Sequence, residues 1–338
     1  MNTSVATISE RDFTAALVDD GPAAAGRSND AANVDSGPAK AGEQLLHRLF
    51  NPSWGKEAQP APRFDAQDLY VGGKPRATDI QQDRIGDCYF VATMGAVADQ
   101  QPDRIRDAIK FDPATGNYTV TLHKKEWGWL PPGYQTKEVQ IPVTQQEIED
   151  NLKRGGGSTV DNKPGTDKPI WPAVMETAYA KMYDSDWSNG LAQGYKEING
   201  GKAYDAMFAI TGTEGDNIKP VGMFGGKVAA DMMEPQISKA LADGKPVTLS
   251  TDPENRSLGD ILTGGKGKQD GLVDNHVYTV ERVYKDSNGE VKVELRNPWG
   301  TNNNVGEGKD TPNATITVNL KDLIDTGGLE YVNVGPAK

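Results

Sequence analysis

Cysteine is almost missing from this chain, in which Cys88 is the only one among 338 residues. A lone cysteine excludes an intramolecular disulfide, so nothing in the sequence points to an oxidising compartment. No apolar run approaches the roughly 18 residues that a membrane span needs. Residues 1–13 lack a basic start and an apolar stretch, so they do not form a secretory signal peptide. We expect a protein without a membrane span that is either cytoplasmic or exported without a signal peptide.

Basic residues are outnumbered by acidic ones. The chain has 36 Lys and Arg against 48 Asp and Glu, which gives a formal net charge of -12. An acidic surface repels phosphate groups, which argues against nucleic acid and anionic membranes as partners. The length allows a sizeable core and favours two domains. We expect a monomer whose partners are protein or peptide substrates.

Large apolar residues are scarce at the start of the chain. Residues 1–60 are rich in Ala, Ser, Asp, Gly and Asn, so we expect a disordered leader. Near its end, leucines and a phenylalanine recur at helical spacing and predict a short helix over 43–50. His47 lies on this helix and is interpreted as a solvated histidine.

The segment 81–98 (QQDRIGDCYFVATMGAVA) surrounds the lone cysteine. Gly86 permits a tight turn and Asp87 is a residue type that caps helices, after which apolar residues recur every three or four positions. The pattern predicts a buried helix with Cys88 in its first turn, where the helix dipole favours the thiolate that a nucleophile needs. The competing interpretation is a small buried hydrophobic residue, as most lone cysteines are.

Two parts with different secondary structure follow the leader. The first part, 61–212, contains helices and a hairpin, with elements predicted over 103–110, 117–124, 137–143 and 171–182. The second part, 213–338, begins with a helix and continues mainly as strands, predicted over 229–242, 246–250, 277–284, 291–296 and 315–319. Gly-rich stretches at 153–168 and 252–270 are expected to be long loops. The expected fold class is α+β, with a helical lobe and a β-rich lobe.

The spacing of apolar residues also predicts which side chains are buried. One face of the hairpin is expected to be buried and carries Tyr118, Val120 and Leu122. His123 falls on the opposite, polar face and is expected to be exposed, so it is not a catalytic candidate. In the helix over 229–242, the positions expected to face the core are Met232, Ile237 and Leu241.

Two polar residues end neighbouring strands of the second part. His276 begins the strand 277–284 and Asn297 ends the strand 291–296. If these strands form an antiparallel hairpin around a four-residue loop, 285–288, the two residues stand directly opposite each other. A two-residue loop would offset them by four residues but leave them on the same face. A single bulge would put them on opposite faces.

If His276 and Asn297 lie on the same face of the hairpin, their side chains can act together. The Asn297 carbonyl accepts a hydrogen bond from one imidazole nitrogen, and the other nitrogen is free to take a proton from a thiol. Trp299 would lie against the pair and exclude water. Taken singly, His276 is interpreted as a satisfied histidine and Asn297 as a turn former before Pro298. Together with a capped cysteine far away in the sequence, they show the pattern of a thiol protease.

These segments resemble the calpain family of cysteine proteases, specifically its two-part protease core. ATDIQQDRIGDCYF is similar to the family's nucleophile segment, and GLVDNHVYTV and ELRNPWG are similar to its histidine and asparagine segments. WPAVMETAYAKM resembles the family's core helix, and YKEINGG resembles the turn after it. ITVNLKDLIDTGGLEYVNV resembles the strand and helix that close the core. The resemblance covers roughly residues 79–334 and implies a two-lobed, papain-like core.

The resemblance implies a thiol endopeptidase that hydrolyses peptide bonds of proteins through an acyl-enzyme. By position, Cys88 is the nucleophile, His276 the general base and acid, and Asn297 the residue that orients the histidine. Gln82 falls at the place of the family's oxyanion-hole glutamine, and its amide is a suitable donor to a tetrahedral intermediate. Trp299 is a supporting residue. The chemistry itself requires no cofactor.

The resemblance also implies Ca²⁺ as a regulator, bound in each half through loop carbonyls and acidic side chains. Asp79 matches one acidic position, whereas Lys196 stands where the family has an acidic partner, with Glu197 next to it. In the second half, Asn303 and Asp310 are the oxygen-bearing candidates. Hard cations take several anionic oxygens, so the lysine argues against a calcium requirement.

Two other functions stay open on the sequence alone. A calpain-like module that binds a protein partner without turnover would keep the fold but leave Cys88 unreactive. An acyl transferase would use a similar cysteine and histidine, although an acidic residue normally takes the place that Asn297 has here. Alkylation by iodoacetamide separates the first alternative from a protease, because an activated thiolate reacts quickly.

Overall fold

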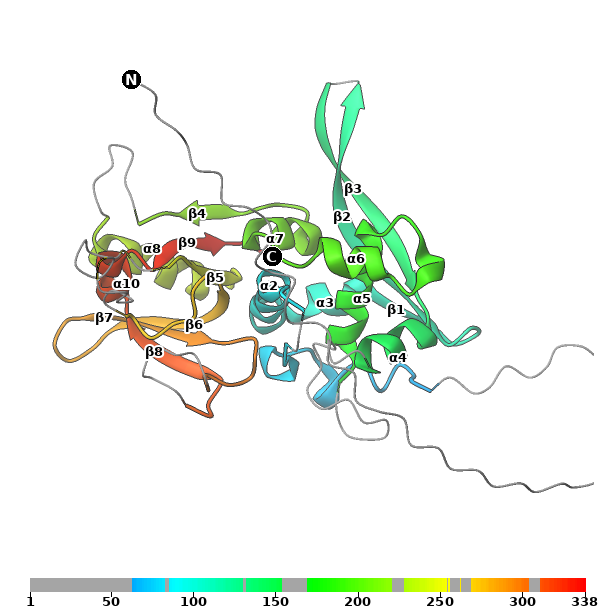
Figure 1. Ribbon diagram of the computed structural model, residues 1–338, viewed down its shortest axis with the longest axis horizontal. Helices are drawn as coiled ribbons and strands as arrows, with labels where there is room; N and C mark the ends of the chain where they lie inside the picture. Colours follow the sequence, from blue (N-terminus) through cyan, green and yellow to red (C-terminus); the bar gives the residue numbers. More distant parts are fainter. Residues whose placement is uncertain are drawn as a thin grey trace, which may run out of the picture. The chain divides into compact units, whose positions relative to one another are not determined.

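A computed structural model describes residues 63–338 except for the stretches 83–84, 130–131, 154–168, 221–227, 254, 256–261, 263–268 and 304–310. The expected leader over 1–60 and its helix over 43–50 lie outside the described residues, as do most of the expected loops 153–168 and 252–270. Residues 61–338 form one compact unit (Figure 1). Its helices and two sheets confirm the predicted α+β fold class.

Helix α2, Cys88–Gln100, is the predicted cysteine-bearing helix, and its residues 89–98 are all buried. Gly95 brings this helix close to strand β6, Val277–Lys285, because a Cβ atom on Gly95 would lie 2.9 Å from the Thr279 Oγ1. That hydroxyl donates a hydrogen bond of 2.7 Å to the carbonyl oxygen of Ala92. The helix of the candidate nucleophile therefore packs directly on the strand that follows the candidate histidine.

The first sheet has three antiparallel strands in the order β1-β2-β3, which are Ile109–Asp112, Asn117–Trp129 and Pro132–Val143. Helix α5, Trp171–Tyr183, packs against β2 and β3. The other helices of this part are α3 (Pro102–Ala108), α4 (Gln145–Lys153), α6 (Ala192–Glu197), α7 (Ala203–Thr211) and the 3-10 helices η1 (Val71–Gly73), η2 (Ala77–Asp79) and η3 (Trp187–Asn189). As predicted, the buried side chains of β2 include Tyr118, Val120 and Leu122.

The β2–β3 hairpin is longer than the predicted strands and extends away from the helices (Figure 1). Near its end, Trp127, Trp129 and Tyr134 are 54%, 83% and 75% exposed. Trp127 pairs with Tyr134 across the strands, and the centroids of their rings are 5.2 Å apart. Such aromatic cross-strand pairs stabilise strand pairing, which explains why the hairpin continues past its buried base.

The second sheet has six strands in the order β4-β9-β5-β6-β7-β8. Besides β6, its strands are β4 (Asp216–Ile218), β5 (Val247–Thr251), β7 (Val291–Arg296), β8 (Thr315–Asn319) and β9 (Leu329–Val334). Helices α8, Ala230–Ala242, and α10, Leu320–Thr326, pack against it. The expectation that Met232 faces the core is wrong, because Met232 is 64% exposed and Met233 is buried.

Buried apolar side chains form two clusters, one almost wholly from residues 64–210 and the other from residues 230–334. Val277 and Tyr331 belong to the first cluster although they lie in the second sheet. Helix α7 ends at Gly212, whose φ of 82° is a left-handed conformation that glycine adopts without strain. Division of the described chain into lobes at this glycine stays a prediction.

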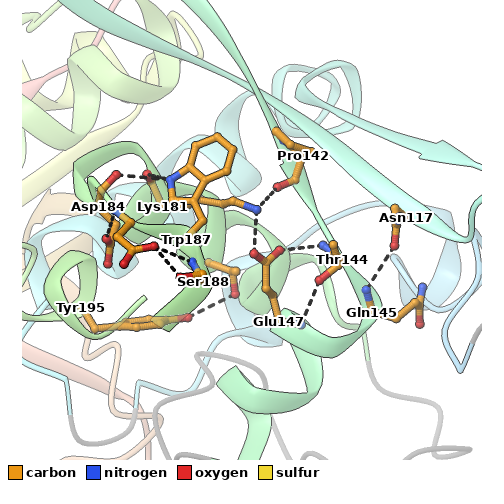
Figure 2. Close-up of polar contacts among 12 residues, drawn as sticks. Asn117, Pro142, Thr144, Gln145, Glu147, Lys181, Asp184, Trp187, Ser188 and Tyr195 are labelled. Atoms are coloured by element: carbon orange, nitrogen blue, oxygen red, sulfur yellow. Dashed lines mark hydrogen bonds and ion pairs between the residues drawn. The ribbon is translucent and has the colours of Figure 1, made fainter. Parts of the chain in front are cut away.

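A buried ion pair joins α4, α5 and the end of β3 (Figure 2). The Lys181 Nζ lies 2.6 Å from the Glu147 Oε1 and donates to the Pro142 carbonyl oxygen at 2.8 Å. The Glu147 Oε2 accepts the backbone N–H of Thr144 at 2.8 Å, at the start of α4. The ring of Trp187 lies 4.3 Å from the ammonium nitrogen. Each charge of the pair is therefore hydrogen-bonded as well as neutralised.

Candidate active site

His276 and Asn297 reach the same face of the β6–β7 hairpin by a route that differs from the prediction. Residues 286–290 connect the paired strand ends, rather than the expected loop 285–288. With this connection alone, His276 and Asn297 would lie on opposite faces. A bulge at Glu281 shifts the register by one residue and returns both to one face. The predicted register is therefore wrong, whereas the predicted pairing of the two side chains is present.

Asn297 holds the imidazole of His276. The His276 Nε2 and the Asn297 Oδ1 are 3.0 Å apart, and the same Oδ1 accepts the backbone N–H of Trp299 at 3.0 Å. Because a backbone N–H only donates, the oxygen of the Asn297 amide must face this side. The imidazole then carries its proton on Nε2, since it must donate to that oxygen. Its Nδ1 is left free to act as a base.

Neighbouring residues leave the imidazole little freedom. The ring centroid of Trp299 lies 4.7 Å and that of Tyr278 5.0 Å from the His276 ring centroid. The backbone N–H of His276 donates to the Thr251 Oγ1 at 3.0 Å, and its carbonyl oxygen accepts the Thr251 N–H at 2.9 Å. His276 is 4% exposed and Asn297 is 0% exposed. The pair is therefore almost completely shielded from water.

Cys88 and His276 line the same cavity, which has a volume of about 320 Å³. The backbone of Val277 hydrogen-bonds the Cys88 thiol, so the sulfur lies beside the residue that follows the histidine. Three glycines line the cavity, which are Gly86, Gly200 and Gly201. A Cβ atom on Gly201 would lie 2.4 Å from the ring of Tyr89, so a side chain is excluded there. Bare backbone at this wall allows an extended peptide to approach closely.

Charged side chains line another part of this cavity. Lys202 and Glu330 form an ion pair in which the Nζ and Oε1 are 2.5 Å apart. Asp252 lines the same cavity, and burial raises the pKa of its carboxyl, with the charge of Glu330 adding to the effect. Asn275 precedes the histidine with a φ of 50°, a left-handed conformation that asparagine adopts more readily than most residues.

Burial favours the neutral forms of both the Cys88 thiol and the His276 imidazole. It raises the pKa of the Cys88 thiol to about 11, and the hydrogen bond from the Val277 backbone offsets only part of this. Burial also lowers the pKa of His276 to about 4, although the hydrogen bond to Asn297 acts in the opposite direction. Burial thus acts against the thiolate that the helix dipole at the start of α2 favours, and the thiolate form of Cys88 stays a prediction.

Gln82 lies close to the start of α2, with its amide nitrogen engaged. The Gln82 Nε2 donates to the carbonyl oxygen of Ile85 at 2.7 Å and to the Asp87 Oδ1 at 3.2 Å. Its backbone N–H donates to the carbonyl oxygen of Pro298 at 2.7 Å, which ties it to the turn after Asn297. To bind an oxyanion, one side-chain N–H would have to exchange its acceptor for the substrate oxygen. That role stays a prediction.

Asp87 is the N-cap residue of α2, but its carboxylate makes no hydrogen bond to the helix backbone, contrary to expectation. Asp87 and Glu176 are both 0% exposed. Burial, together with the adjacent charge of Glu176, raises the pKa of Asp87 well above its usual range. Asn151 donates to the Glu176 Oε2 at 2.6 Å and to the Tyr195 hydroxyl at 2.8 Å. Burial and the adjacent charge of Glu176 therefore both favour the protonated form of the Asp87 carboxyl.

The expected calcium ligands do not gather around an ion site. The Asp79 Oδ2 accepts the Trp171 Nε1–H at 2.8 Å and the Arg76 backbone N–H at 2.9 Å. Glu197 and Asn303 are exposed, and Asp310 lies outside the described residues. In the part of the chain that the structure describes, no three His, Cys, Asp or Glu side chains form a metal-binding group. The described residues do not fit a calcium site built on Asp79, and no step below is assigned to calcium.

Three residues near the site were not singled out from the sequence. Tyr278 follows His276 by two positions in a strand, and this period-two spacing could have indicated a shared face. Thr251 ends β5 and pairs with His276 only through the sheet, so it carries no local signal. Asn302 is 0% exposed and accepts a hydrogen bond from Asn297, and as one of three consecutive asparagines, 302–304, it carries no local signal of burial.

His123 is half-buried rather than exposed, which corrects the prediction. Its Nδ1 lies 3.3 Å from the Ala209 carbonyl oxygen, and its Nε2 lies 3.8 Å from the Glu138 carboxylate. Helix α7 covers this face of β2, which the alternation of apolar residues did not indicate. His123 is not among the residues that line the cavity with Cys88.

Comparison with known proteins identifies the family of the chain. The profile of calpain family cysteine proteases matches residues 48–321. Calpain-8 of Homo sapiens is 27% identical over 249 residues, covering 72% of this chain and 30% of that protein. Calpain-9 of Mus musculus is 26% identical over 245 residues, covering 72% and 31%. The calpain-type cysteine protease DEK1 of Zea mays is 24% identical over 250 residues, covering 70% and 10%.

Because the profile covers most of the chain, this protein belongs to the calpain family of cysteine proteases. The aligned residues account for about a third or less of the length of these relatives. Among the described residues, every helix is too short or too polar to span a membrane.

Proposed function

We propose that this chain is a thiol endopeptidase that cleaves protein substrates with Cys88 as nucleophile, His276 as base and acid, and Asn297 as the residue that orients the histidine. The observation that carries the proposal is the 3.0 Å hydrogen bond between the His276 Nε2 and the Asn297 Oδ1. It directs the free Nδ1 of the imidazole away from the asparagine. The imidazole and the Cys88 thiol line one cavity, as a thiol–imidazole pair requires.

The reaction begins with both groups neutral. The His276 Nδ1 takes the thiol proton while the Cys88 sulfur forms a bond to the scissile carbonyl carbon. The imidazolium is held by Asn297 and then gives this proton to the leaving amine as the carbon–nitrogen bond breaks. Water, deprotonated by His276, then attacks the acyl carbon. The carbon–sulfur bond breaks, the imidazolium returns the proton to the Cys88 sulfur, and the acid product leaves. We assign the proton transfer to the attack step because burial raises the pKa of the thiol and lowers that of the imidazole, which disfavours a preformed ion pair.

The developing oxyanion needs donors near the nucleophile. The backbone N–H of Cys88, at the first position of α2, is one such donor, because N–H groups of the first helical turn have no partner within the helix. Gln82 supplies a second donor if one N–H exchanges the Asp87 carboxylate for the oxyanion. We assign it this role on its place beside the start of α2.

Hydrolysis of unfolded casein tests the proposal. Wild type, Cys88→Ala and His276→Ala are compared in millimolar calcium and in EGTA, with His123→Ala as a control that removes a half-buried histidine elsewhere. We expect wild type and His123→Ala to cleave, and the other two variants to lose at least about a thousandfold in rate. Equal cleavage by Cys88→Ala would contradict the proposal.

A protein-binding module without turnover is the second candidate, and one observation favours it. Burial holds the Cys88 thiol in its protonated form, as in a structural cysteine. A peptidyl chloromethyl ketone separates the two candidates, because it alkylates a catalytic cysteine through a substrate-like complex. Peptide mapping by mass spectrometry identifies the labelled residue, and a label on cysteine is on Cys88 because the chain has no other cysteine. Saturable labelling supports the protease, and none after long incubation supports the binding module.

A further inference from the structure

Asn302 lies directly behind the asparagine of the proposed triad. It is 0% exposed, and its Oδ1 accepts a hydrogen bond of 3.1 Å from the Asn297 Nδ2. Its own Nδ2 donates to the carbonyl oxygens of Asn313 and Ala314, both at 2.8 Å. Asn302 and Thr311 also form an isolated antiparallel β-bridge. Both ends of this buried side chain therefore have partners.

These contacts determine how the Asn302 amide is oriented. Carbonyl oxygens only accept hydrogen bonds, so the group that faces Asn313 and Ala314 must be the NH₂ of Asn302. The amide oxygen is then turned towards Asn297. That oxygen can only accept, so it selects the NH₂ end of the Asn297 amide. The two carbonyl oxygens therefore fix the orientation of the Asn302 amide, and the Asn302 amide in turn fixes the orientation of the Asn297 amide.

The orientation of the Asn297 amide determines which nitrogen of the His276 imidazole is protonated. With its NH₂ on Asn302, Asn297 presents Oδ1 to the His276 Nε2 and to the Trp299 N–H. This oxygen requires the proton of His276 to be on Nε2, which frees Nδ1 for the thiol. If Asn302 were absent, the buried NH₂ of Asn297 would lose its acceptor. An unsatisfied buried donor costs free energy, so the present orientation of the Asn297 amide would become less stable relative to a rotated one.

We infer that Asn302 is a positioning residue of the active site, which acts through Asn297 to keep the His276 tautomer suited to taking the thiol proton. The inference rests on the proposed function. The other role open to Asn302 is to hold the loop around Thr311 by its β-bridge and its bonds to two carbonyls. Both roles predict a less stable variant, so stability alone does not distinguish them.

A double-mutant cycle distinguishes the two roles. Asn302→Leu is made in wild type and in Asn297→Ala, and kcat and KM are measured for a peptide substrate. We expect Asn302→Leu to lower kcat roughly tenfold in wild type, with KM changed less than about twofold, and to lower kcat less than about twofold in Asn297→Ala. An equal factor in both backgrounds would show that Asn302 acts only through the loop and would overturn the inference.

Two further variants control for the loop. Asn313→Ala removes an exposed side chain but keeps the backbone carbonyl that Asn302 uses, and we expect wild-type kcat. Asn302→Asp keeps an oxygen for the Asn297 NH₂ but loses donors to the two carbonyls. We expect it to unfold at lower urea than Asn302→Leu and yet to retain more of the wild-type kcat. The reverse order of kcat would contradict the positioning role.

A readout without turnover separates this inference from the proposed function. Imidazole ¹⁵N chemical shifts report which nitrogen of His276 is protonated. They are assigned by comparison with His276→Ala. We expect the Nε2–H form in wild type and a mixture of tautomers in Asn302→Leu. An unchanged tautomer in Asn302→Leu would overturn the inference. If wild type does not cleave peptides but the tautomer shifts as expected, the proposed function fails and the positioning role of Asn302 stands.

Discussion

Asn297 shares a face with His276 because Glu281 is an extra residue in β6. On the loop side of the bulge Arg282 faces Glu294, whereas on the site side Thr279 faces Arg296. The register therefore shifts by one residue between the turn and the active site. Side chains alternate between faces with a period of two, so this single shift decides whether the imidazole and the amide can meet.

Deletion of Glu281 should abolish activity while the sheet survives. Without the extra residue, the pairing set by the turn would continue to the strand ends and turn His276 away from Asn297. We expect a loss of at least about a thousandfold in kcat/KM, as for removal of the histidine itself. Glu281→Ala is the matched control, because it keeps the backbone residue and loses only the carboxylate that accepts from Thr315. An active deletion variant with native circular dichroism would refute the register argument.

Alkylation of Cys88 should increase with pH well above neutrality. The thiol has a pKa of about 11 in the free protein, and His276, with a pKa of about 4, is not charged at pH 7 and does not stabilise a thiolate. Only the thiolate reacts with iodoacetamide, so the rate should rise about tenfold per pH unit between pH 7 and 10. The rate is followed by mass spectrometry, with free cysteine as the reference. A plateau below pH 8 would show that a thiolate–imidazolium pair is present.

Strand bounds were predicted best where they depend only on residues close together in the sequence. The bounds of β7 and β8 agree with the predicted strands 291–296 and 315–319, because alternating residues are bordered there by turn-forming ones. The register between β6 and β7 was not predictable in this way. A bulge leaves no pattern in the strand, and the turn-forming residues 287–289, which are Ser-Asn-Gly, do not determine the length of the turn.

Features set by tertiary packing were missed for physical reasons. The buried stripe of α8 contains Ile237 as predicted, but Met233 takes the place expected for Met232, because two adjacent methionines fit the apolar pattern equally well. The ionisation of Cys88 was predicted from the helix dipole alone, whereas burial of the thiol in the folded chain acts in the opposite direction. Asn302 lies in a polar run, and only its contact with Asn297 reveals its burial.

Replacement of Glu176 by glutamine should make the stability less dependent on pH. The pKa of Asp87 is raised in the folded state, mainly by burial and then by Glu176, whereas the unfolded carboxyl ionises near pH 4. The folded state thus binds more protons than the unfolded state above that pH, and stability falls as pH rises. Glu176→Gln removes the adjacent charge and keeps an oxygen for Asn151.

We therefore expect Glu176→Gln to lose less stability than wild type between pH 4.5 and 8, with each unit of lowered Asp87 pKa contributing about 1.4 kcal/mol. Urea unfolding at several pH values measures the difference. Parallel curves for the two proteins would show that Glu176 does not raise the pKa of Asp87.

Loss of the Lys181 ammonium should destabilise the fold strongly. The Lys181 side chain is 4% exposed and that of its partner Glu147 is 16% exposed, so Lys181→Met leaves a poorly hydrated carboxylate without its cation. Breaking a buried pair in this way costs about 3 kcal/mol. Lys239→Met is the matched control, because Lys239 is 75% exposed and pairs with Asp243 on the surface of α8, where the cost should stay below about 0.5 kcal/mol. Urea unfolding at low and high salt measures both, and equal costs would mean that burial does not strengthen the Lys181 pair.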